Sequence, residues 1–148
     1  MFNPSREQVR RFFCEAWRKH RERQILEGAE VTAADLIEQH PEYHALLENP
    51  EAAVEQEFTP DNGQMNPFLH LSLHLAIADQ ISIDQPPGIR AIYDTLRLRL
   101  DVHETEHAIL ECLGETLWRS QRDGKPMDAM YYLESLRRNT LFVECVRN

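Results

Sequence analysis

The sequence has 148 residues, of which 42% are hydrophobic and 28% are charged, and its formal net charge is −9. This composition is typical of one soluble globular domain with its own core. It excludes a membrane protein, because no segment approaches the roughly 18 consecutive apolar residues of a bilayer span. The N-terminus is charged and lacks the apolar region of a secretory signal. Three widely spaced cysteines without a C-x-x-C motif predict reduced thiols and a cytoplasmic protein.

Charge is unevenly distributed along the chain. Residues 1–23 hold seven basic and three acidic side chains, whereas residues 27–61 hold ten acidic side chains and neither Lys nor Arg. The simplest interpretation is that the basic and acidic segments pack against each other. We do not expect a nucleic-acid partner, because the total charge would repel phosphates outside the basic segment.

The first predicted helix covers residues 5–27. Ser5 followed by Gln8 has the pattern of a capping box, and Gly28 ends the helix. A second helix start is indicated at Thr32, where a cap residue is followed three positions later by an acid.

Proline interrupts the next part of the chain. Pro41 forces a break or a fresh first turn within the segment 40–44, which reads His-Pro-Glu-Tyr-His. Residues 49–65 are acidic and contain two prolines and a glycine. We expect them to form a long surface loop with at most a short helix around 51–55.

The helix predicted over 66–81 organises the rest. Asn66 is a good N-cap and Pro67 suits the first helical position. His70 and His74 are one turn apart and lie centrally on the apolar face.

The remaining apolar periodicity predicts helices over 89–100 and 101–121, and a last helix after Pro126. We therefore expect an all-α fold, in which residues 1–148 form a single-domain antiparallel helical bundle of five to six helices. The helices 66–81 and 101–121 should be its most buried elements.

A second histidine pair occupies the helix at 101–121. His103, His107 and Glu111 form a ladder one turn apart, and Gly114 shares their face. Cys112 lies on the opposite side, which argues against a Cys–His nucleophile pair.

Alternating helix directions would bring the two histidine pairs to the same end of the bundle. Four imidazoles and a carboxylate would then converge as they do in bundle metalloproteins. The hypothesis is a site for a divalent metal ion (Zn, Fe, Mn or Ni), with possible additional ligands at His40 and His44 and further off at His20. Its ligands would be His70, His74, His103, His107 and Glu111.

Two observations weigh against this hypothesis. Buried histidines are more often hydrogen-bonded core residues than ligands, and helix N-termini disfavour cations.

The segment 103–107 also has the H-E-x-x-H spacing of zinc metalloproteases, in which Glu104 would act as a base on metal-bound water, but no third ligand follows at the usual spacing.

No nucleophile context, phosphate-binding loop or dinucleotide motif is present in the sequence, so no catalytic or organic-cofactor site is assigned. A metal-binding bundle could serve as a hydrolase or an oxygen-handling protein. The alternative function is a metal-free protein-interaction module, with the basic first helix and the acidic 27–61 stretch as docking surfaces for a protein partner or a homodimer.

Several strings resemble a family of small proteobacterial proteins known only as a domain of unknown function, number 1841. The resemblance covers nearly the whole chain and implies a bacterial cytoplasmic protein, without an activity or a catalytic residue. The matching strings are Asn3–Arg6, Arg10–Phe13, His40–His44, Asn66–Ile77, Ile83–Ile89 and His107–Glu115.

Overall fold

The computed structural model describes residues 5–58 and 66–147, with side chains up to Thr140. Within those residues there are eight α-helices, a short 3-10 helix (η1) and no strand, so the all-α prediction is confirmed. Six of the helices have nine residues or more. The two short helices, α3 (His44–Leu47) and α4 (Pro50–Glu55), bring the total above the predicted five to six. The antiparallel bundle stays a prediction.

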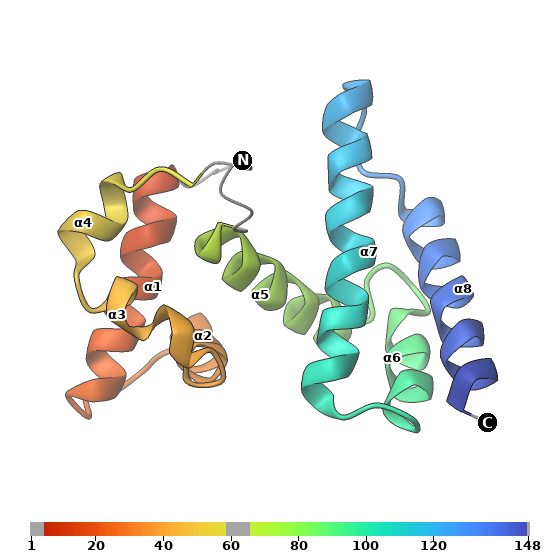
Figure 1. The fold of residues 1–148 in the computed structure, drawn as a ribbon, viewed down its shortest axis with the longest axis horizontal. Coiled ribbons are helices and arrows are strands. Elements are labelled where there is room, and N and C mark those ends of the chain that lie inside the picture. Colours follow the sequence, from red (N-terminus) through yellow and green to blue (C-terminus); the bar gives the residue numbers. More distant parts are fainter. Residues whose placement is uncertain (1–4, 59–65, 148) are drawn as a thin grey trace. The chain divides into compact units, whose positions relative to one another are not determined.

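The chain divides into two compact units, Met1–Leu75 and Ala76–Asn148, and each is described by itself (Figure 1). The expectation of a single domain stays a prediction. The long helix α5 (Pro67–Ile83) contributes its first half to the first unit and its second half to the second unit.

The first unit packs its helices around an apolar core. Its elements are α1 (Arg6–Arg21), α2 (Ala29–Glu38), η1 (Pro41–Tyr43), α3 (His44–Leu47), α4 (Pro50–Glu55) and the start of α5. Helix α1 contacts α2, α3 and α4, so it is the centre of this unit. The core side chains include Phe13, Ala16, Trp17, Leu36, Ile37, Leu47, Phe68 and Leu71.

Helix α1 begins as predicted and ends early. The Ser5–Gln8 capping box is present in both directions. The helix stops at Arg21 instead of residue 27, because Arg23 adopts a left-handed conformation with φ 57°. The Gln24 amide then donates to the Lys19 carbonyl at 2.8 Å, which closes the last turn.

The basic and acidic segments pair within the first unit, as their composition predicted. Arg10 is only 2% exposed and donates to three carbonyls at the end of α4, those of Ala53, Val54 and Gln56. Lys19 forms an ion pair with Glu30 at 2.9 Å. These contacts satisfy helix-end carbonyls and stabilise the packing of α1 on α2 and α4.

The start predicted for the second helix was wrong. Helix α2 begins after Gly28, four residues before the expected start at Thr32. The predicted loop 49–65 contains α4, which is close to the short helix expected around 51–55. Residues 59–65 of that loop lie outside the described residues.

The second unit is built from the end of α5, α6 (Ile89–Arg97), α7 (Val102–Asp123) and α8 (Ala129–Arg147). Helices α7 and α8 run antiparallel (Figure 1). Helix α7 ends at Gly124 as predicted, because this glycine adopts a left-handed φ of 65°. The core side chains include Ile77, Ile89, Ile92, Leu96, Ile109, Leu113, Tyr132 and Leu136.

The buried face of α7 differs from the prediction. The fully buried positions on this helix include Thr105, Ile109 and Cys112, which lie on the side away from the histidines. His103 and His107 are half-buried. Leu110, on the histidine side, is also buried. The helix carries apolar residues on both sides, so periodicity alone could not rank the two faces.

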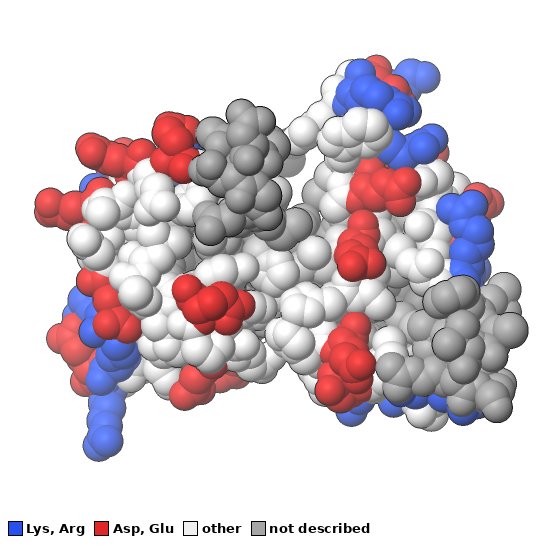
Figure 2. All heavy atoms as spheres, in the orientation of Figure 1, with Lys and Arg blue, Asp and Glu red and all other residues white. Residues whose placement is uncertain are grey.

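Most of the charged side chains of α7 lie on its exposed face. Figure 2 shows acidic side chains along the visible face of α7, and basic side chains near its C-terminal end. The exposed glutamates of the helix include Glu104, Glu111 and Glu115. Glu111, a predicted ligand, is therefore a solvent-exposed carboxylate.

Candidate metal centre

His70 and His74 occupy successive turns of α5. Asn66 caps this helix, accepting a hydrogen bond at 2.9 Å from the Phe68 amide, so the predicted helix start is confirmed. The two Nε2 atoms lie 3.1 Å apart, and the ring centroids are separated by 4.7 Å. The i, i+4 spacing therefore aims both imidazoles at one point.

His40 joins this pair from the turn after α2. As the residue before Pro41 it leaves the helical conformation, with φ −125° and ψ 69°. Its Nδ1 lies 2.7 Å from the Leu36 carbonyl oxygen, and its Nε2 lies 3.2 Å from Nε2 of His70. Because a carbonyl can only accept, Nδ1 carries the proton, and the lone pair of a neutral His40 is on Nε2.

The three Nε2 atoms match the spacing of ligands around a small cation. Zinc–nitrogen bonds of about 2.0–2.1 Å in a tetrahedron place the nitrogens about 3.3 Å apart. The two measured separations, 3.1 Å and 3.2 Å, are close to this value, and the candidate ligand atoms of the three histidines all lie within 4.8 Å of one another. A single proton on His70 can bridge only one neighbour, whereas a cation would bind all three lone pairs.

The cluster is largely removed from solvent. His40 is 3% exposed and His74 is 0% exposed, while His70 is half-buried. Buried imidazoles that converge nitrogen to nitrogen are costly unless something compensates them. Three neutral nitrogen donors form a tripod of the kind that binds borderline divalent metals.

The other histidine of the His-Pro-Glu-Tyr-His string has a different role. The Nε2 atom of His44 lies 2.8 Å from the Ile37 carbonyl oxygen and donates to it, and the ring stacks on Trp17 with centroids 4.2 Å apart. Both histidines of the string thus satisfy carbonyls in the last turn of α2. His40 uses Nδ1 for this hydrogen bond and His44 uses Nε2, so only His40 has its Nε2 left to face the cluster. His20 lies elsewhere, stacked on Trp17.

The second pair, His103 and His107, is placed on α7 with ring centroids 4.1 Å apart. These residues and Glu111 belong to the second unit, so their convergence with His70 and His74 stays a prediction. Glu104 accepts from the Asp101 amide at 3.2 Å within a capping box. This structural role argues against Glu104 as the base of a metalloprotease-type site.

Sequence reasoning missed Tyr43. Its ring is parallel to that of His40, with an interplanar angle of 2° and centroids 5.4 Å apart, and it meets His70 edge-on at 6.0 Å. Burial raises the pKa of the Tyr43 phenol above its usual value. The available signal was its position between the two histidines of the 40–44 string.

The fold and the cluster define an all-α protein with a three-histidine candidate centre. The model of the family described as Domain of unknown function (DUF1841) matches residues 5–138, and the chain belongs to this family. No curated protein and no solved structure matches the chain. Among the described residues, no helix has the length and apolar character needed to cross a membrane.

Proposed function

We propose that this protein binds one divalent transition-metal ion through the Nε2 atoms of His40, His70 and His74. The observation that carries the proposal is the pair of Nε2···Nε2 separations of 3.1 Å and 3.2 Å, which meet at His70. The hydrogen bond from His40 Nδ1 to the Leu36 carbonyl supports it, because metal-bound histidines commonly donate their other N–H to such an acceptor.

The donor set favours some ions over others. Imidazole nitrogens suit Zn²⁺, Fe²⁺ and Ni²⁺, whereas Mn²⁺ prefers carboxylate oxygens, and the three-histidine cluster supplies none. We therefore rank Zn²⁺ first among the predicted ions and Mn²⁺ last.

We retain from the sequence the proposal that the second pair supplies a further ligand. Three imidazoles leave a tetrahedral ion one ligand short. His107 is the first candidate, followed by His103, and the exposed Glu111 is the weakest. The substitution His107→Ala tests it: a loss of affinity of tenfold or more supports the fourth ligand, and an unchanged affinity overturns it.

We also infer a bacterial setting, which the family resemblance implies, and a cytoplasmic one, which the buried free thiols of Cys14 and Cys112 support. The alternative function, a metal-free interaction module, is less well supported. Arg10 and Lys19 of the basic helix make contacts inside the first unit, so these charges are not available for a partner.

The test is metal binding by the full-length protein prepared without a histidine tag. We expect one Co²⁺ or Zn²⁺ per chain by titration calorimetry and elemental analysis. His40→Ala and the less buried variant His70→Ala should each lower the affinity at least 100-fold. His44→Ala is the matched control, because it removes an imidazole from the same string outside the cluster, and it should bind as the wild type does. Wild-type protein without metal affinity, or equal affinity in His40→Ala, would overturn the proposal.

A further inference from the structure

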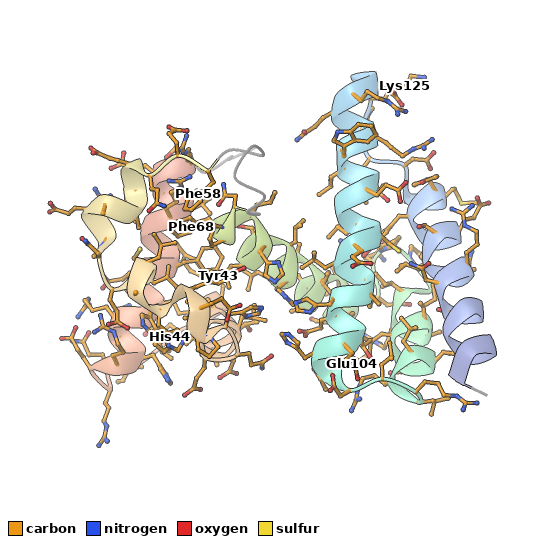
Figure 3. The ribbon with its side chains drawn as sticks, in the orientation of Figure 1. Tyr43, His44, Phe58, Phe68, Glu104 and Lys125 are labelled. Atoms are coloured by element: carbon orange, nitrogen blue, oxygen red, sulfur yellow. The ribbon has the colours of Figure 1, made fainter. Side chains whose placement is uncertain are left out.

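The orientation of His40 depends on more than one contact. The Nδ1 hydrogen bond to the Leu36 carbonyl holds one edge of the imidazole, but the ring can still pivot about that bond. Tyr43, labelled in Figure 3, lies in the short 3-10 helix directly after His40. Its ring is parallel to the imidazole within 2°, with centroids 5.4 Å apart. A flat contact of this kind blocks the pivot and keeps Nε2 aimed at His70.

The same contact favours the metal-bound state of His40. A metal ion withdraws electron density from the imidazole that binds it, so the ring becomes more positive. The face of a phenol is electron-rich and attracts positive groups stacked on it. Tyr43 also touches His70 edge-on, with centroids 6.0 Å apart, so two of the three proposed ligands contact this ring.

We propose, resting on the metal centre above, that Tyr43 is a positioning residue for that centre. Its aromatic face, rather than its hydroxyl group, fixes the imidazole of His40 for metal binding. No motif in the sequence assigns this role to Tyr43.

The experiment compares two substitutions in full-length, tag-free protein titrated with Co²⁺. Tyr43→Phe keeps the aromatic face and should bind Co²⁺ within about threefold of the wild type. Tyr43→Leu keeps an apolar side chain without the face, and should bind about tenfold more weakly, as expected for loss of a contact that orients a ligand. Tyr131→Leu removes a tyrosine from the second unit and is the matched control, with unchanged affinity.

A spectroscopic measurement keeps the test decisive if Tyr43→Leu folds poorly. Co²⁺ binding should change the near-ultraviolet circular dichroism of tyrosine in the wild type, because the stacked imidazole gains charge. This change should disappear in Tyr43→Phe, which still binds the ion. A tyrosine signal that persists in Tyr43→Phe would overturn the contact.

The outcomes separate this inference from the proposed function. Wild-type protein that binds no Co²⁺ would overturn the metal centre. Normal wild-type binding with an unchanged affinity in Tyr43→Leu would overturn only the role of Tyr43. Equal losses in Tyr43→Phe and Tyr43→Leu would assign the effect to the hydroxyl group and overturn the stacking argument.

Discussion

The two H-x-x-x-H pairs have the same spacing but different surroundings. In the first unit, His70 and His74 on α5 meet a third imidazole, His40, from the turn after α2. In the second unit, His103 and His107 lie on a half-buried face of α7 whose opposite side, with Thr105, forms the core. Spacing therefore fixes that two histidines share a helix face, and the neighbouring elements decide whether that face becomes a site.

The comparison also shows how each pair is held in place. The first turn of α5 is held by tertiary contacts. The guanidinium of Arg10 lies over the ring of Phe68, 5.0 Å from the centroid of that ring. Phe68 also packs against Phe58 (Figure 3). The first turn of α7 is instead held locally by the Asp101–Glu104 capping box. The first pair should thus respond to changes far away in sequence, and the second pair to changes nearby.

The largest effect on stability is expected at Arg10. Arg10→Met should lower the free energy of unfolding by about 3 kcal/mol, because it leaves buried carbonyls without their charged donor. Urea unfolding followed by circular dichroism measures this loss. Arg11→Met is the control, since Arg11 pairs with the exposed Glu7 at 3.0 Å, and an exposed pair contributes about 0.5 kcal/mol at most. Equal effects in the two variants would contradict the role given to Arg10.

If the ion binds only to the first unit, metal binding should slow the chemical modification of cysteine in the first unit more than in the second. A ligand at 100 times its dissociation constant stabilises the state that binds it by about 2.7 kcal/mol. Cys14, buried in the first unit, should then react with a thiol reagent about 100-fold more slowly, while Cys112 should not change.

Mass spectrometry of labelled peptides reads the two cysteines separately. Both react slowly in the folded protein, because burial raises the pKa of each thiol. Equal protection of Cys14 and Cys112 by Zn²⁺ would favour ligands from both units, including His107. No protection of either would contradict the metal centre.

Thr105 and Thr116 allow a matched pair of substitutions in the core side of α7. The Thr105 hydroxyl is buried and, within the described part of the chain, has no hydrogen-bond partner, whereas the Thr116 hydroxyl donates to the Cys112 carbonyl at 2.7 Å. Thr105→Val should raise the free energy of unfolding by up to about 1 kcal/mol, and Thr116→Val should lower it by about 1 kcal/mol. Thermal unfolding would measure both, and a loss in Thr105→Val would mean that its hydroxyl has a partner.

An effect as small as that of Thr116→Val is expected at the cap that precedes the second pair. Asp101→Ala should destabilise the start of α7 by about 1 kcal/mol, because it removes the oxygen that accepts from the Glu104 amide at 2.7 Å. Asp101→Asn, which retains an acceptor, should recover most of this stability. Hydrogen exchange of the first turn of α7 would measure the loss, and unchanged exchange in Asp101→Ala would contradict the importance of the cap.

Local signals in the sequence determined much of this protein. Ser5, Asn66 and Gly124 mark helix ends because caps and left-handed residues act within a few positions. The spacing of His70 and His74 places both on one side of α5, since helical geometry repeats every 3.6 residues. The basic residues are separated from the acidic ones along the sequence, which predicted that α1 pairs with the segments after it. Composition is enough for this prediction, because opposite charges attract.

Only the tertiary structure decided which histidines meet. His40 is thirty positions before His70 in the sequence, and its approach depends on the bend at Pro41 and on the packing of α2. The buried side of α7 was likewise settled by its neighbours, because a helix with apolar residues on both sides has no preferred face until another element covers one. Tyr43 owes its position on His40 to the same bend, so the environment of the cluster follows from contacts that no local pattern encodes.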